Sequence, residues 1–352
     1  MTIKTKPHSA YSVGWICALS KEQTVATAML EERHGDLPKP SHDSNTYTLG
    51  SISGHNVVIA CLPKGRYGTN SATNVVTLMS GTFPSLKICL MVGVGGGVPP
   101  KVRLGDVVVS TPEGQHPGVV QWDMGKAEDG GFERTGALNN PPNSLLSALN
   151  KLETEHTLTG SKIPEYLNQI AQKYPRVAKR YLKSDGLKDM LFQVDYIHVD
   201  RPRMGKEVTA EEEDESHGDG SDEEEDNICY HCDKTKIVKR KRRLMRVHYG
   251  LIASGNQVVK DGVFRDKLNQ DLGGGVLCFE MEAAGLMNNF SCLVIRGISD
   301  YSDSHKNEAW QDHAAAVAAA FARELLGHVQ FSDIEGEPPV AVMLNKGWRY
   351  VF

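Results

Sequence analysis

Two pairs of polar residues stand in apolar surroundings where carboxylates are uncommon. Glu280 and Glu282 flank Met281 directly after one apolar run. Ser299 and Asp300 stand at the end of the next apolar run. A buried carboxylate without partners costs free energy, and a ligand that carries hydroxyl groups would supply such partners. The pattern therefore favours a site for a hydroxylated ligand, with acids that reach solvent at a sheet rim as the alternative.

A further acid, Glu22, lies near the amino terminus, where an apolar run passes into a helix-like stretch. The partial positive charge at the first turn of a helix favours carboxylate over carboxylic acid, and an ionised carboxylate suits a general base. The alternative is an ordinary glutamate in the first turn of a helix. The interpretation of Glu22 as a general base therefore depends on the other candidate residues.

A glycine-rich stretch, Gly93 to Pro99, follows the expected strand Ile88 to Val92. Glycines let the backbone approach a ligand closely and leave amides free to donate hydrogen bonds, which makes Gly93, Val94 and Gly95 candidate binding residues. Val98 occupies the place of the last glycine in GxGxxG, and the Lys-Ser/Thr pair of a P-loop is missing. Neither NAD nor ATP is favoured, and a tight turn without a ligand is the alternative.

These candidates need elements that hold them together, and the sequence predicts a parallel sheet. Apolar runs rich in β-branched residues predict strands at Val13 to Leu19, Val57 to Leu62, Ile88 to Val94, Val107 to Ser110, Val247 to Ala253, Val276 to Phe279 and Leu293 to Ile298. Helices are expected at Lys21 to Arg33, Thr69 to Met79, Glu282 to Asn288 and Trp310 to Leu326. This alternation predicts an α/β fold with a mostly parallel twisted sheet, helices on both faces, and sites at strand ends.

The regular pattern is interrupted in the middle of the chain. The expected organisation is a flexible amino terminus at 1–10, a single domain at 11–326 with an insertion at about 130–246, and a carboxyl-terminal extension at 327–352. Within the insertion, Ile163 to Leu187 suggests helix. The acidic run Glu211 to Asp226 predicts a disordered loop, with a docking segment as the alternative.

Composition narrows the class of function. The chain has 352 residues, 40% of them hydrophobic, with a mean hydropathy of -0.36 and no apolar run of the length that a membrane span needs. A net charge of -5 argues against a nucleic-acid partner. We therefore expect a cytoplasmic protein with a small-molecule ligand.

The cysteines suggest no cofactor. Five of the seven lie in apolar runs, where a reduced thiol behaves as a small hydrophobe. Cys229 and Cys232 form a CxxC motif in polar sequence, which could bind zinc or form a redox pair. A closed zinc site needs four ligands and no second CxxC exists, so unpaired thiols or a local clip are expected, without a metal.

Together these features resemble the nucleoside phosphorylase and nucleosidase superfamily, and within it the purine-nucleosidase-like domain found in fungi. The resemblance covers most of residues 11–326 outside the insertion. It is carried by Glu280-Met281-Glu282-Ala283-Ala284, Arg296-Gly297-Ile298-Ser299-Asp300, Gly93 to Gly97, Gly105 to Val109, His248 to Asn256 and Asp300 to Lys306.

The resemblance implies a role for each candidate. Met281 and Glu282 match positions that hold the ribose. Asp300 matches the residue that donates a proton to N7 of the purine, which requires a neutral carboxyl in an apolar setting. Val258 and Val259 match the segment that lines the base. Pocket residues in this superfamily are usually shared between subunits, which implies a homo-oligomer.

The resemblance also bears on the nucleophile. It implies a reaction through a ribosyl cation, which water captures in the nucleosidases and phosphate captures in the phosphorylases. Phosphorylases commonly have an Arg-Val-Gly-Ser pattern at the glycine turn, whereas this chain has Met91-Val92-Gly93-Val94. Glu22 matches the glutamate that activates water in bacterial methylthioadenosine nucleosidases, and its charge would repel phosphate. We therefore predict a purine nucleosidase that cleaves adenosine first, with inosine and guanosine as further candidates.

Two alternatives stay open. A phosphate-dependent phosphorylase would need an arginine from elsewhere, such as Arg66 or Arg103. A non-catalytic module that senses nucleosides or mediates interactions belongs to a different class of function, and the joint presence of Glu22, Glu282 and Asp300 argues against it.

Overall fold

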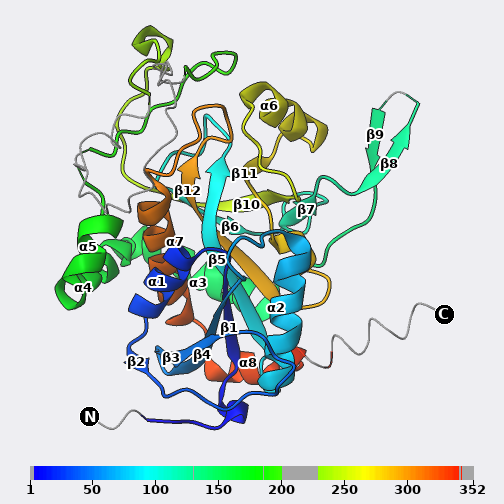
Figure 1. Cartoon of the computed structure of the whole chain (residues 1–352), viewed down its shortest axis with the longest axis vertical. Coiled ribbons are helices and arrows are strands. Elements are labelled where there is room, and N and C mark those ends of the chain that lie inside the picture. The colour runs from blue at the N-terminus through cyan, green and yellow to red at the C-terminus, as the bar shows by residue number, and fades with distance from the viewer. Residues whose placement is uncertain (1–3, 130, 185, 200–228, 341, 343–352) are drawn as a thin grey trace, which may run out of the picture.

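The fold is organised around one large sheet in a computed structural model that describes residues 4–129, 131–184, 186–199, 229–340 and 342 (Figure 1). The strand order is β11-β10-β6-β12-β5-β1-β4-β3-β2, with β7 beside β10 and a further pairing of β11 with β5. The strands of this sheet are β1 (Val13–Cys17), β2 (Glu32–Arg33), β3 (Tyr47–Ile52), β4 (His55–Cys61), β5 (Ile88–Gly97), β6 (Val107–Ser110), β7 (Val119–Gln121), β10 (Val247–Ser254), β11 (Val276–Glu280) and β12 (Cys292–Asp300).

Most neighbouring strands are parallel, which confirms the predicted α/β class. The central strands β1, β4, β5 and β12 pair in parallel, as do β10 and its neighbours β6, β7 and β11. The pairs β2–β3, β3–β4, β5–β11 and β6–β12 are antiparallel. Because β1, β5 and β12 run in the same direction, their carboxyl ends meet at one edge of the sheet.

Helices cover both faces of this sheet. Trp15 on β1 belongs to a core with α1, α3, α4 and α7, while its neighbour Ile16 belongs to a second core with α2 on the opposite face. Alternate side chains of a strand point to opposite faces, so each strand feeds both cores. The helices are α1 (Ser20–Ala28), α2 (Thr69–Thr82), α3 (Asn143–Thr159), α4 (Ile163–Lys173), α5 (Pro175–Tyr181), α6 (Gly262–Asp271), α7 (Gln311–Leu326) and α8 (Phe331–Gly336), with short 3-10 turns at His8–Ala10, Lys234–Lys236 and Ala283–Gly285.

Two expected elements differ from the structure. The glycine-rich stretch expected as a turn lies inside β5, which continues to Gly97. The helix expected at 282–288 is reduced to the 3-10 turn Ala283–Gly285 followed by further turns. In both places tertiary packing at the edge of the sheet outweighs the intrinsic conformational propensity of the residues.

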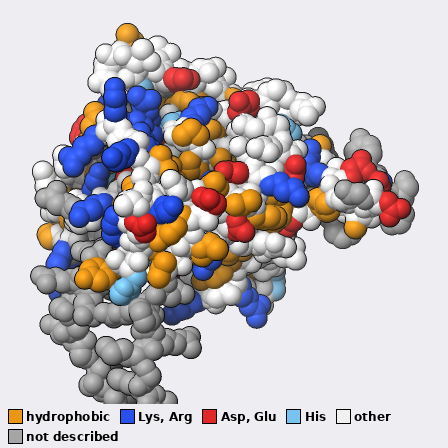
Figure 2. Space-filling model, turned by 90° about the horizontal axis from the view of Figure 1, so that it is seen from above, with side chains coloured by type: hydrophobic (Ala, Val, Ile, Leu, Met, Phe, Trp, Pro, Cys, Tyr) orange, Lys and Arg blue, Asp and Glu red, His pale blue; other side chains and the backbone are white. Residues whose placement is uncertain are grey.

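The middle of the chain contributes peripheral elements. The helix expected at 163–187 is split into α4 and α5, because Pro175 begins a new helix after Tyr174. The hairpin of β8 (Gly125–Glu128) and β9 (Gly131–Arg134) projects from the body, with acidic side chains toward its tip (Figure 2). The acidic run 211–226 lies outside the described residues. Within the described ranges, no helix is long and apolar enough to cross a membrane.

Candidate functional site

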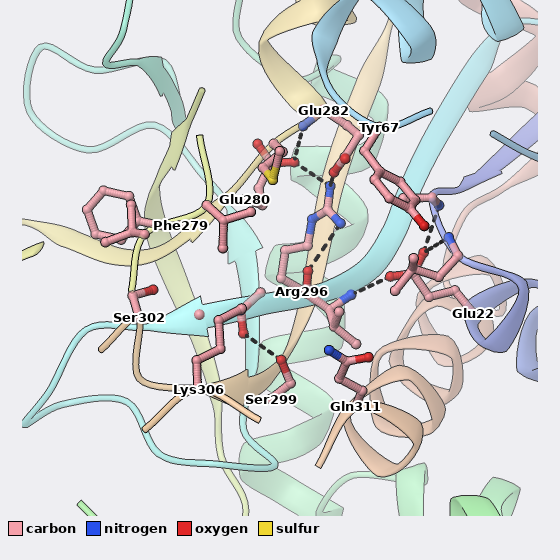
Figure 3. Close-up of a pocket in the computed structure, with 18 of the residues that line it drawn as sticks. Glu22, Tyr67, Phe279, Glu280, Glu282, Arg296, Ser299, Ser302, Lys306 and Gln311 are labelled. Atoms are coloured by element: carbon pink, nitrogen blue, oxygen red, sulfur yellow. Dashed lines mark hydrogen bonds and ion pairs between the residues drawn. The ribbon is translucent and has the colours of Figure 1, made fainter. Parts of the chain in front are cut away.

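A pocket of about 200 Å³ lies where the carboxyl ends of β1, β5, β11 and β12 meet (Figure 3). Nine of the residues predicted for the site line it: Glu22, Val94, Gly95, Val258, Val259, Glu280, Met281, Glu282 and Ser299. The sequence prediction missed the other lining residues, which are Ala18, Leu19, Tyr67, Gly96, Gln257, Phe279, Arg296, Ser302, Lys306 and Gln311. Of the predicted residues, Gly93 and Asp300 are not among those that line this pocket.

Glu22 is held firmly at one end of the pocket. One carboxylate oxygen accepts hydrogen bonds from the backbone N–H groups of Ala18 (2.7 Å) and Leu19 (2.9 Å), at the start of α1. The other accepts from the N–H of Val94 on β5 (2.8 Å). Burial raises the pKa of Glu22, and this effect outweighs nearby Arg296 and the three amide donors. The result is an oriented carboxylate with increased basicity.

Arg296 organises the acidic side chains. It projects from β12, is 1% exposed, and forms ion pairs with Glu280 and Glu282. The Glu280 carboxylate also accepts from the N–H groups of Glu282 (3.1 Å) and Ala283 (3.0 Å). Glu280 is thus occupied by Arg296 and the backbone, which leaves Glu282 as the acid better placed for a ligand.

Glu282 retains unused accepting capacity at the pocket wall. It accepts a long hydrogen bond from the Gly68 N–H (3.3 Å) and lies 3.4 Å from Arg296 Nη2. Burial raises the pKa of Glu282, with smaller increases from Glu280 and Glu22, while Arg296 opposes the shift. A carboxylate short of strong donors can accept hydrogen bonds from ligand hydroxyls.

The glycines of β5 make room for these side chains. A Cβ atom at Gly93 would overlap the Glu22 carboxylate and the Arg296 guanidinium. A Cβ at Gly96 would overlap Ser302 Oγ and lie 2.6 Å from Asp300 Oδ1. The main role of these glycines is therefore to leave room for polar side chains from other elements. Gly93 leaves room for Glu22 and Arg296, although it does not line the pocket itself.

Asp300, at the end of β12, is buried and hydrogen-bonded. It accepts from Ser299 Oγ (2.8 Å), the Ser302 N–H (2.9 Å) and Lys306 Nζ (2.5 Å). Three donors, one of them charged, thus surround the Asp300 carboxyl group. Lys306 and Ser302 line the pocket, whereas Asp300 lines a neighbouring cavity, and the neutral state expected for Asp300 stays a prediction.

The remaining wall is apolar and suits a flat ring. Phe279 is buried, Val259 is 6% exposed and Val258 is 51% exposed at the rim. Tyr67, from the loop before α2, stands 49% exposed at the opening. The lining thus combines these apolar side chains with the polar side chains of Glu22, Glu282 and Lys306, which is an arrangement suited to an amphipathic ligand.

Comparisons with known proteins agree with this architecture. No protein-family model matches the chain. A protein of Hyaloscypha variabilis described as a nucleotide-binding leucine-rich repeat (NLR)-like protein is 47% identical over 323 residues, or 90% of this chain. The chain spans 29% of the length of that relative.

Solved structures with the same fold include two proteins named as nucleosidases and one named as a hydrolase. A 5'-methylthioadenosine/S-adenosylhomocysteine nucleosidase from S. pneumoniae has a TM-score of 0.54 and 16% identity, over 91% of this chain and all of the other. The enzyme of the same name from Neisseria meningitidis has a TM-score of 0.54 and 16% identity, over 90% and 98%. Futalosine hydrolase of Helicobacter pylori has a TM-score of 0.53 and 17% identity, over 91% and 98%.

The chain therefore has the same fold as these three enzymes, and the α/β fold that the sequence resemblance implied is confirmed. At these identities the likeness concerns the fold, and the site's chemistry rests on its own geometry.

Proposed function

We propose that this chain is a purine nucleosidase, which hydrolyses the N-glycosidic bond of a purine ribonucleoside to free base and ribose. Adenosine is the first substrate to test. The fold shared with proteins named as nucleosidases supports this class of reaction. The observation that carries the proposal is Glu22, a buried carboxylate oriented at the pocket by three backbone amides.

In the proposed reaction Glu22 acts as the general base. A water molecule bound to its carboxylate attacks C1' of the ribose, and the bond from C1' to N9 breaks. The water proton passes to Glu22 as the new C–O bond forms. The raised pKa of Glu22 suits this role, because a stronger base accepts the proton more readily.

The other end of the pocket stabilises the leaving group. In this proposal Glu282 accepts hydrogen bonds from the ribose hydroxyls beside Met281, and Phe279, Val258 and Val259 contact the base. Asp300 and Lys306 share the proton that N7 accepts as the glycosidic bond breaks. Protonation at N7 lets the base leave as a neutral molecule instead of an anion.

The charge arrangement supports water over phosphate as the nucleophile. Glu22, Glu280 and Glu282 line the pocket and would repel a phosphate dianion. Among the described lining residues, the cations are Arg296, which pairs with Glu280 and Glu282, and Lys306, which pairs with Asp300.

The two arginines considered as alternative phosphate ligands do not favour a phosphorylase either. The guanidinium of Arg103 donates to the Lys241 carbonyl (2.7 Å), and neither Arg103 nor Arg66 is among the described residues that line the pocket.

Product analysis tests the proposal. The chain is incubated with adenosine, inosine, guanosine or 5'-methylthioadenosine, with and without phosphate, and the sugar product is identified by chromatography. Free ribose (or 5-methylthioribose) without phosphate is the expected result. Ribose 1-phosphate formed only with phosphate would establish a phosphorylase instead. Nucleoside binding by calorimetry without turnover would favour the non-catalytic sensor.

A further inference from the structure

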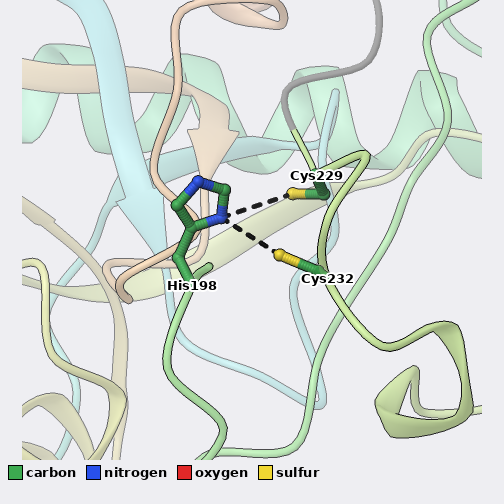
Figure 4. Close-up of side chains that lie close together, drawn as sticks. All are labelled: His198, Cys229 and Cys232. Carbon is green, nitrogen blue, oxygen red and sulfur yellow. Dashed lines mark hydrogen bonds between the residues drawn. The ribbon is translucent and has the colours of Figure 1, made fainter. Parts of the chain in front are cut away.

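Outside the pocket, three side chains with metal-binding atoms converge on one point (Figure 4). His198 Nδ1 lies 3.3 Å from Cys232 Sγ and 3.9 Å from Cys229 Sγ. All three ligand atoms lie within 4.8 Å of one another. The sequence prediction missed this cluster because His198 is 31 residues away from the CxxC motif.

The spacing of these atoms matches a tetrahedral site. For Zn–S of about 2.3 Å and Zn–N of about 2.05 Å, tetrahedral angles place nitrogen and sulfur roughly 3.6 Å apart. The two observed nitrogen–sulfur distances fall on either side of that value. An ion would therefore need only small shifts of these side chains.

The surroundings give the cluster a defined structure. Cys229 and Cys232 are 2% and 4% exposed and pack against Phe192. The Val199 N–H lies 3.5 Å from Cys232 Sγ, in the hydrogen-bonding arrangement that often supports a thiolate ligand. The Cys232 N–H donates to the Cys229 carbonyl (3.1 Å), which forms the tight turn that brings both sulfurs to one side.

The two chain segments that carry the ligands are also paired through their backbones. The Gln193 N–H donates to the Lys236 carbonyl (2.9 Å), and the Val238 N–H donates to the Leu191 carbonyl (2.8 Å). The Tyr196 hydroxyl accepts from the Asp233 N–H (2.7 Å). These hydrogen bonds hold residues 191–196 and 233–238 together beside the cluster.

We propose that His198, Cys229 and Cys232 bind one Zn²⁺ ion. Two sulfurs and one imidazole nitrogen in a buried tetrahedral arrangement match the ligand preferences of Zn²⁺, whereas iron–sulfur clusters usually take four cysteines. Water takes the fourth position. By binding both His198 and Cys229, the ion links two residues that are 31 positions apart in the sequence.

The site also adjoins the loop that follows Asp300 at the end of β12 and carries Lys306. The His198 N–H donates to Ser304 Oγ (3.0 Å), and the ring of Phe192 stacks on His305 at 4.0 Å. Zn²⁺ bound here fixes the segment against which this loop packs. The ion is a structural element beside the pocket, and its presence does not depend on which nucleoside, if any, the pocket binds.

Metal analysis of the full chain tests this inference. Protein produced in zinc-supplemented medium and purified without chelators should contain about one Zn²⁺ per chain by mass spectrometry. Replacement of Zn²⁺ by Co²⁺ should give the intense absorption of cobalt–thiolate bonds. Removal of the ion by a chelator should lower the melting temperature of the wild-type chain.

Variants separate this site from adventitious binding. His198→Ala and Cys232→Ser should bind Zn²⁺ at least about tenfold more weakly. His231→Ala is the matched control, because His231 lies between the two cysteines but is exposed and outside the cluster. It should retain the ion.

Three results would overturn the inference: wild-type protein that binds neither Zn²⁺ nor Co²⁺, a Cys229–Cys232 disulfide in the protein as purified, or equal metal content in His198→Ala and wild type. If the variants fail to fold, the cobalt spectrum and metal content of the wild-type chain decide the question.

Discussion

Glu22→Gln is the substitution that most directly tests the proposed nucleophile. The amide has nearly the same shape as the carboxylate but cannot accept the water proton. Its oxygen can replace the carboxylate oxygen that binds the Ala18 and Leu19 amides. Its NH₂ group then faces the Val94 N–H, which loses the acceptor it has at 2.8 Å.

The expected loss of catalytic rate can be separated from the expected loss of folding stability. A positioned general base contributes roughly 10²- to 10⁴-fold to the rate, which corresponds to about 3 to 5 kcal/mol in the activation free energy. The unpaired Val94 N–H costs about 1 to 3 kcal/mol in folding stability. Removing a buried charge offsets part of that cost. We therefore expect kcat to fall by roughly 10²- to 10⁴-fold, with a small change in KM and a folded protein.

Initial rates of adenosine hydrolysis, followed by chromatography of released adenine, measure the effect. Circular dichroism and thermal melting establish that the variant is folded. Glu308→Gln is the matched control, since the Glu308 side chain is 80% exposed and pairs with Lys21; its rate should equal that of the wild type. A folded Glu22→Gln enzyme with kcat within about tenfold of wild type would refute the role of Glu22 as base.

Three further predictions concern the same molecule. Asp300→Asn should lower kcat by roughly 10²-fold or more with little change in KM, because the proton shared with Lys306 reaches N7 mainly in the transition state; unchanged steady-state turnover would exclude Asp300 from the reaction. Burial raises the pKa of Glu22, and the base must be ionised, so kcat/KM should fall as the pH decreases through a value above 4.5. A pH profile without an acidic limb above that value would contradict this. Asp106→Ala should reduce the free energy of unfolding by about 3 to 5 kcal/mol in urea titrations, because it leaves Arg243 and His248 without their buried partner. Those partners hold the pKa of Asp106 below its usual 3.8, so the difference from wild type should shrink as the pH falls below that value, and a constant difference would refute the electrostatic explanation.

The sheet could be predicted from sequence because its strands are buried on both faces. β6 and most of β1, β4, β10, β11 and β12 coincide with continuous apolar runs, which is typical of parallel sheets. The strand β3, which lies next to the short edge strand β2, was missed because Tyr47 to Ile52 mixes polar residues and glycine with apolar ones. The last part of β5 was missed because glycine has no preference for strand, and only its packed neighbours hold it there.

The acids of the site could also be identified, because a carboxylate in apolar sequence is conspicuous. Arg296 belongs to a motif that carries the resemblance, but nothing in the sequence indicates that it forms an ion pair with Glu280. Its role depends on a contact between β12 and β11, which spacing along the chain does not encode. Lys306 was missed although it lies only six residues after Asp300, because the conformation of the loop between them decides whether its ammonium group reaches that carboxyl group.

The glycines in the last part of β5 have a consequence for how this domain assembles. Glycine in a strand gives up side-chain packing and costs roughly 0.5 to 1 kcal/mol per residue in backbone entropy. At Gly93 and Gly96 the vacant volume is occupied by Glu22, Arg296, Ser302 and Asp300. The end of the central strand and the pocket should thus become ordered in one cooperative step, so that native-state hydrogen exchange protects the amides of both to the same degree.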